Sequence, residues 1–183
     1  VIANDINPLS AILTMPRLEA PLIANIDVRL RAIKVAAKQR NDIDLSMFYH
    51  PDTERELLNL RAYLADRLDS GKEDDADRWI RMVATNRLTG HSPGFFSAYT
   101  LPPNQAVSVD AQIKINAKRD QTPPIRDLVS IILKKTRTLF RDGVPASARD
   151  FTLSTGAADK LVEIPDGTVA LTVTSPPFLD VVQ

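Results

Sequence analysis

Short apolar runs at both ends of the chain, with a long stretch of helical spacing between them, constrain the fold most. Residues 1–3 (VIA) precede a polar cluster at residues 4–8, and residues 168–174 (TVALTVT) are β-branched and mostly apolar. Runs of this kind are typical of strands buried in a parallel sheet. We therefore predict an α/β fold that is helix-rich overall. Its expected parts are a partial sheet of few strands from residues 1–26 and 143–183, and a large helical insertion over residues 27–142.

The middle of the chain is predicted to contain five helices. They are expected over residues 27–40, 53–68, 75–88, 108–119 and 124–141. Thr53 and Glu56 have the spacing of a capping box at the start of the second of these helices, and His50 is expected at its entry. The basic side chains of the first helix face either solvent or phosphate groups.

A shorter helix is expected over residues 9–14, directly after the first apolar run. Asn7 is a favoured helix cap, and Pro8 suits the first helical position, where its missing N–H costs nothing. Pro16 should stop this helix, because the residue before a proline avoids helical geometry. The N-terminal segment therefore has the pattern of a strand, a turn and a helix.

Composition excludes several classes of function. The 183 residues include 23 basic and 23 acidic side chains, which excludes a basic nucleic-acid arm or a polybasic membrane anchor but leaves a local basic face open. No apolar run approaches the ~18 residues of a membrane span. The absence of cysteine excludes disulfides, thiolate nucleophiles and cysteine-based zinc sites, and His50 and His91 are far apart in the sequence. We expect a cytoplasmic protein without a metal.

The connector over residues 89–103 combines glycine, proline and aromatic residues with His91. Two interpretations of it remain. Its aromatic side chains either pack the connector against the helices, or Phe95, Phe96 and Tyr99 border a cleft for DNA or a cofactor.

The tetrapeptide after the predicted strand 168–174 carries the clearest chemistry. It consists of Ser175, Pro176, Pro177 and Phe178. The prolines lack N–H groups, so the backbone offers carbonyl acceptors in a stiff, extended arrangement, beside a hydroxyl and a flat aromatic face. Acceptors for the two N–H groups of a nucleobase amine favour a pyramidal nitrogen that can attack a methyl donor, and the aromatic ring can stack on an extruded base. The alternative is a turn that merely ends the strand.

A second candidate site lies at residues 4–8 (NDINP). A carboxylate such as Asp5, at the end of a strand and just before a helix, can accept both hydroxyl groups of a ribose. Because the carboxyl ends of parallel strands meet at one edge of a sheet, Asp5 and residues 175–178 are expected at the same edge. An acidic turn residue without a ligand is the alternative.

These two segments resemble motifs of the amino-group DNA methyltransferases, the S-adenosylmethionine-dependent enzymes of restriction–modification systems. The catalytic motif of that family has the form Ser/Asp/Asn-Pro-Pro-Tyr/Phe, and its second strand often ends in a stretch similar to residues 4–8. Residues 165–169 (PDGTV) also look like this family, and residues 79–105 resemble a helical insertion in a subset of its members. The resemblance implies a Rossmann-like methyltransferase sheet, S-adenosylmethionine as the cofactor and double-stranded DNA as the partner.

The resemblance also implies roles for individual residues. Asp5, with Asn7 beside it, would bind the ribose of the cofactor, and Ser147, with Asp150 three positions later, is the nearest fit to the residue that contacts the adenine. The predicted catalytic residues are Ser175 and Pro176, which would accept hydrogen bonds from the target amine, Pro177, and Phe178, which would stack on the flipped base. A serine at the first motif position favours cytosine N4 over adenine N6. The lack of cysteine excludes the carbon-5 cytosine enzymes, which need a thiolate.

The glycine-rich loop of the family, which should precede the strand of Asp5, is missing, and the chain starts without methionine. We therefore expect an internal segment of a larger methyltransferase that is inactive alone and self-associates to cover exposed strand edges. Two alternative functions remain. One is a helical DNA-binding or protein-interaction module without catalytic activity, and the other is a methyltransferase acting on RNA or a protein amide.

Overall fold

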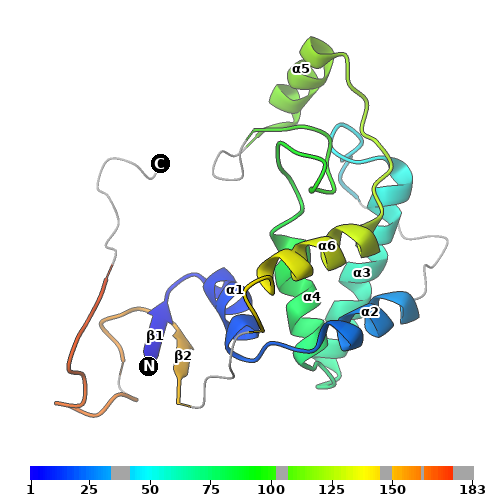
Figure 1. Cartoon of the computed structure of the whole chain (residues 1–183). Coiled ribbons are helices and arrows are strands. Elements are labelled where there is room, and N and C mark those ends of the chain that lie inside the picture. The colour runs from blue at the N-terminus through cyan, green and yellow to red at the C-terminus, as the bar shows by residue number, and fades with distance from the viewer. Residues whose placement is uncertain (34–41, 102–106, 145–149, 162, 175–183) are drawn as a thin grey trace.

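The computed structural model describes residues 1–33, 42–101, 107–144, 150–161 and 163–174. Within these residues, six helices and a two-stranded sheet follow one another along the chain (Figure 1). The elements are β1 (Ile2–Asp5), α1 (Pro8–Leu18), α2 (Ile23–Ala32), α3 (Pro51–Asp69), α4 (Asp75–Thr85), α5 (Val109–Arg119), α6 (Leu128–Leu139) and β2 (Thr152–Thr155).

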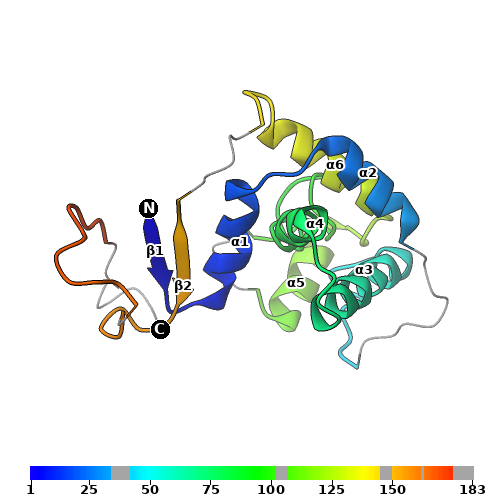
Figure 2. The same ribbon diagram turned by 90° about the horizontal axis from the view of Figure 1, so that it is seen from below.

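Parallel pairing of β1 and β2 joins two segments that are far apart in the sequence. Ile2 pairs with Thr152 and Asp5 pairs with Thr155, so both strands end at the same edge of the sheet. Helix α1 contacts both strands and also α4, and in both views it lies between the sheet and the remaining helices (Figure 1, Figure 2). The prediction of a helix-rich α/β structure is confirmed at this level.

The hydrophobic core of the described residues lies among α2, α3, α4 and α6. Its most deeply buried large side chains include Trp79, Ile80, Met82, Phe96 and Ile132. The indole Nε1 of Trp79 donates to Oγ1 of Thr136 at 3.0 Å, and the ring centroids of Trp79 and Phe140 are 4.6 Å apart. Every buried member of this core lies between Ile26 and Phe140. The helical part therefore has a core of its own, to which the sheet contributes no buried side chain.

Helices α3 to α6 all form close to the ranges that the sequence indicates, but α4 ends at Thr85 rather than at residue 88, and α6 begins at Leu128 rather than at residue 124. The cap of α3 also differs. His50 caps this helix, as its Nδ1 accepts the N–H of Asp52 at 3.2 Å, which confirms its expected place at the helix entry. The predicted capping box of Thr53 and Glu56 is wrong. Thr53 is fully buried inside the helix, and its Oγ1 accepts the N–H of Arg126 at 2.8 Å. Thr53 therefore makes a hydrogen bond to a residue far away in the sequence instead of forming a capping box.

The boundaries of the two N-terminal helices also differ from the prediction. Helix α1 continues past Pro16 to Leu18. Although Pro16 has no N–H for the bond to the preceding turn, it is buried, and the packing of α1 along α4 offsets the lost bond. Helix α2 begins at Ile23 rather than at residue 27, and residues 34–40 of that predicted helix lie outside the described residues.

The predicted buried strand over residues 168–174 is wrong. This segment has no strand geometry, and Val169, Leu171 and Val173 are 50%, 79% and 87% exposed. Its β-branched composition favours extended structure, but a buried strand also needs paired neighbours, and within the described residues none pairs with it. The second strand is instead β2, which is not among the predicted strands.

Among the described helices, none is both long enough and apolar enough to cross a membrane. The described part of the chain also contains no cluster of three or more histidine or acidic side chains that could hold a metal ion. The predicted domain boundary between residues 26 and 27 falls inside α2, and the division into domains stays a prediction.

Candidate functional site

The carboxyl ends of β1 and β2 form the edge at which the predicted site residues should meet. Asp5 ends β1 and is paired with Thr155, the last residue of β2. The N–H of the next residue, Gly156, donates to the carbonyl oxygen of Asp5 at 3.1 Å. Open α/β sheets place their ligands at this edge. Asp5 therefore occupies the position relative to the strands that the sequence pattern predicts.

The carboxylate of Asp5 is exposed and held in one orientation. Its Oδ1 accepts the N–H of Asn7 at 2.9 Å, and its Oδ2 accepts the hydroxyl of Ser10 at 2.6 Å. The bond from the backbone of Asn7, followed by the bond from Ser10, lowers the pKa of Asp5 below its ordinary value. The group is therefore ionised at neutral pH. Because an ionised carboxylate offers about four acceptor positions, it retains room for hydroxyl groups of a ligand.

Asn7 has a structural role at this edge. Its Oδ1 accepts the N–H of Leu9 at 3.0 Å and so caps α1, while its role in cofactor binding stays a prediction. Next to this turn, Asn4 ties the two strands together. Its Nδ2 donates to the carbonyl oxygen of Gly156 at 2.9 Å, and its Oδ1 accepts the hydroxyl of Ser154 at 2.9 Å. Side-chain hydrogen bonds therefore connect the two strands at the edge beside the exposed carboxylate.

A cavity of about 410 Å³ lies beside β1 and β2. Its lining includes Asn4, Thr152, Ser154, Gly156, Lys160 and Ile164. The contribution of β2 is not among the sequence-based predictions, because four residues with three hydroxyl side chains do not stand out as a strand. The available signal is the alternation of Phe151 and Leu153 with polar residues, ended by Gly156.

The structure does not bring together all the residues predicted to bind the cofactor. Asp150 precedes β2, and its carbonyl oxygen accepts a hydrogen bond from the terminal ammonium of Val1 at 2.8 Å. It therefore lies at the amino ends of the strands, opposite Asp5, because β2 begins after this residue instead of ending before it. Ser147 lies outside the described residues, and so do the predicted catalytic residues Ser175, Pro176, Pro177 and Phe178.

The described part of the connector after α4 packs against the helices. Phe96 is fully buried within the hydrophobic core, so for this ring the packing interpretation is confirmed. Phe95 is 6% exposed and packs against neighbouring residues of the connector. Gly90 makes the arrangement feasible, because a Cβ at this position would lie 2.5 Å from the ring of Phe95. The guanidinium carbon of Arg87 lies 4.2 Å from the centroid of the same ring. Tyr99 remains half-buried.

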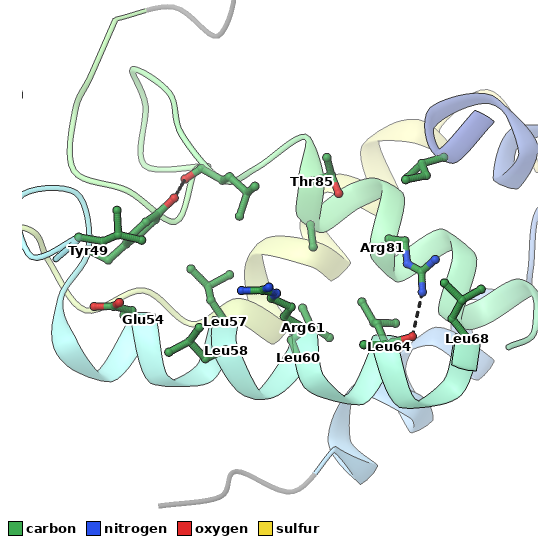
Figure 3. A pocket seen from close by; sticks show the side chains of 15 residues that line it. Tyr49, Glu54, Leu57, Leu58, Leu60, Arg61, Leu64, Leu68, Arg81 and Thr85 are labelled. Carbon is green, nitrogen blue, oxygen red and sulfur yellow. Dashed lines mark hydrogen bonds between the residues drawn. The ribbon is translucent and has the colours of Figure 1, made fainter. Parts of the chain in front are cut away.

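A larger cavity, of about 520 Å³, opens between α3 and α4 (Figure 3). Leucine side chains dominate its wall, and those contributed by α3 are Leu57, Leu58, Leu60, Leu64 and Leu68. Its polar side chains include Arg81, which donates to the carbonyl oxygen of Leu64 and pairs with Glu73, both at 2.8 Å. This lining suits an apolar group better than a catalytic step.

No protein-family model, curated protein or solved structure matches this chain. The functional interpretation therefore depends on the residue patterns and on the geometry of the strand ends.

Proposed function

We propose that the chain is part of an S-adenosylmethionine-dependent DNA methyltransferase that modifies the exocyclic amine of a flipped base, with cytosine N4 preferred over adenine N6. The paired strands would belong to a Rossmann-like sheet, with residues 27–142 inserted into it. Double-stranded DNA would be the substrate, and a restriction–modification system in the cytoplasm is the setting that the sequence resemblance implies.

The position and chemistry of Asp5 carry this proposal. It is an exposed, ionised carboxylate at the carboxyl end of a parallel strand, directly before a capped helix. Each of its oxygens accepts one hydrogen bond within the protein, so each can accept another from a ribose hydroxyl. Asp5 therefore fits the ribose of S-adenosylmethionine, which when bound supplies an electrophilic methyl group on its sulfonium.

The proposed roles of the catalytic residues follow from the chemistry of a conjugated amine. Ser175 and Pro176 would accept hydrogen bonds from its two N–H groups, which favours a pyramidal nitrogen with an available lone pair. Phe178 would stack on the flipped base, a contact worth about 1–3 kcal/mol. The proton that the nitrogen loses after forming its new bond to carbon would pass to solvent, so no dedicated base is required.

Calorimetric titration of S-adenosylmethionine into the protein expressed from the complete reading frame tests the role of Asp5. The substitution Asp5→Asn keeps the size of the side chain and removes its charge, and we expect it to weaken binding by about tenfold or more, because hydrogen bonds to charged groups contribute about 1.5–3 kcal/mol. Asp150→Asn is the matched control at the opposite end of the same strands and should leave the affinity unchanged. Equal losses in both variants, or no binding by the wild type, would contradict the proposal.

The location of the hydrophobic core favours one other candidate, a helical module that binds DNA or a protein without catalysis. All buried members of the core lie between Ile26 and Phe140, so the helices can pack without the sheet. A module of this kind would bind DNA or a protein but transfer no methyl group. A methyl-transfer assay therefore distinguishes it from the proposed methyltransferase.

A further inference from the structure

The apolar cavity between α3 and α4 follows one face of α3. The residues that α3 contributes to its wall recur at intervals of three or four positions from Glu54 to Leu68, and Figure 3 shows them along the helix. This spacing places side chains on a single face of a helix. At 1.5 Å per residue the face is about 21 Å long. The cavity is therefore a groove that runs along most of α3.

This face is only partly covered by the rest of the described chain. Leu60 and Leu64 are buried in the hydrophobic core, whereas Leu68 is 50% exposed and Leu88, on the other side of the groove, is 41% exposed. A helix at the surface normally turns polar residues toward solvent and leucines toward the core. An open groove lined by leucines at helical spacing is instead typical of a surface that binds an amphipathic helix.

Two side chains of opposite charge lie among the leucines of this face. Glu54 and Arg61 both line the cavity and are seven residues, or about two helical turns, apart. Within the part of the chain that the structure describes, neither takes part in an ion pair, whereas the neighbouring Arg55 and Arg81 do. Burial, followed by the negative charge of Asp44, raises the pKa of Glu54. A cation from outside the described chain would offset both effects.

The order of these two charges makes the face complementary to itself. When a second α3 lies antiparallel to the first, with a two-fold axis beside Leu57 and Leu58, Glu54 of each copy lies opposite Arg61 of the other. Both ion pairs then form together, and the leucines of the two copies meet between them. A parallel pair in register would place each charge opposite an identical one, which is unfavourable. Two-fold interfaces that use the same surface on both copies are the commonest in soluble oligomers.

We propose that the face of α3 from Glu54 to Leu68 is the interface of a homodimer, in which a second copy of this chain places its own α3 antiparallel along the groove. A second copy fits better than an unrelated helix, because the chain itself supplies both the apolar face and the matched pair of charges. This interface uses a helix face rather than the edges of the sheet. It does not depend on the methyltransferase proposal.

Sedimentation velocity at micromolar concentrations, with the protein expressed from the complete reading frame, tests this interface. The wild type should sediment as a dimer. Glu54→Arg places two cations opposite each other and Arg61→Glu places two carboxylates opposite each other, so each should raise the dissociation constant about tenfold or more. Asp66→Arg is the matched control, because it reverses a charge at an exposed position of α3 outside the cavity wall, and it should leave the dimer unchanged.

An equimolar mixture of the Glu54→Arg and Arg61→Glu proteins provides the most specific test. In the mixture the two cations of one variant face the two carboxylates of the other, so heterodimers should form from proteins that are monomeric alone. A chain that carries both substitutions should dimerise like the wild type for the same reason. Circular dichroism checks that the variants fold. Glu54→Gln and Arg61→Gln replace any reversal that does not fold, and each should weaken the dimer several-fold.

A wild type that stays monomeric throughout the micromolar range would overturn the inference. A dimer that withstands both charge reversals, a mixture that stays monomeric, or equal weakening by Asp66→Arg would overturn it as well. None of these results decides the methyltransferase proposal, because the association of the chain is measured without DNA or S-adenosylmethionine.

Discussion

At the scale of single residues, the buried carboxylate of Asp77 connects α4 to α2 and α3 by hydrogen bonds. It accepts hydrogen bonds from Arg29 at 2.5 Å, from Nε of Arg67 at 2.8 Å and from the hydroxyl of Tyr63 at 3.1 Å. We expect Asp77→Ala to lower the free energy of unfolding by about 1.5–3 kcal/mol, because it removes the buried acceptor of these hydrogen bonds, although both arginines keep their ion pairs with Asp74. Denaturant titration followed by circular dichroism measures this. The exposed neighbour gives the control: Asp75→Ala should cost less than about 1 kcal/mol, and similar losses in both variants would contradict the account.

Tyr49 makes stability depend on pH in the alkaline range. Burial, with a smaller effect from the charge of Glu54, raises the pKa of Tyr49 to about 12, and its hydroxyl donates to the carbonyl oxygen of Leu88 at 3.1 Å. The unfolded chain should ionise near pH 10, so the contribution to stability is complete below about pH 10 and is lost as the pH rises to about 12. Over this interval the wild type should lose about 2 kcal/mol more than Tyr49→Phe. Urea denaturation at both pH values provides the comparison, and parallel losses would refute the assignment.

At the scale of elements, Thr53 connects α3 to the segment that leads into α6. We expect Thr53→Val, which preserves shape, to destabilise the fold by about 1–3 kcal/mol, since it leaves the N–H of Arg126 without its buried acceptor. Glu56→Gln should change stability by less than about 0.5 kcal/mol, as it takes part in no capping box. Thermal or chemical denaturation measures the stability of both variants. If Thr53 and Glu56 instead formed the local capping box that the sequence suggests, both substitutions would lower stability.

An element can be predicted when the pattern that specifies it lies within its own sequence. Helices α4 and α6 carry apolar stripes within their own sequences, so the local pattern is sufficient to predict that they form, but it does not fix where they end. Helix α1 was predicted too short, because the effect of Pro16 is local whereas the packing that offsets it is not. The strand β2 and the exposed segment 168–174 were assigned incorrectly for a related reason: pairing between segments about 150 residues apart decides which of them becomes a strand.

The candidate site was predictable to a similar extent. Asp5 could be placed because a strand, a turn and a capped helix follow one another within ten residues. The position of Asp150 could not, because it depends on where β2 begins. The side-chain ties from Asn4 to Ser154 and Gly156 depend on a parallel register that no local pattern specifies.

At the scale of the whole molecule, the helices hold the buried core and the sheet lies at its periphery, attached through α1. We expect amides of α4 and α6 to exchange with deuterium far more slowly than those of β1 and β2, because opening of a two-stranded pair exposes little apolar surface. Hydrogen exchange followed by mass spectrometry measures this. Equal protection of the strands and the central helices would show that the sheet belongs to the cooperative core.

Transfer of a methyl group to a base amine can be detected by mass spectrometry of nucleosides. The nucleosides are taken from duplex DNA that has been incubated with S-adenosylmethionine and the protein expressed from the complete reading frame. We expect N4-methylcytosine in the wild-type reaction and its loss with Ser175→Ala. A wild-type reaction that contains no methylated nucleoside, or one whose product persists with Ser175→Ala, would contradict the proposed function.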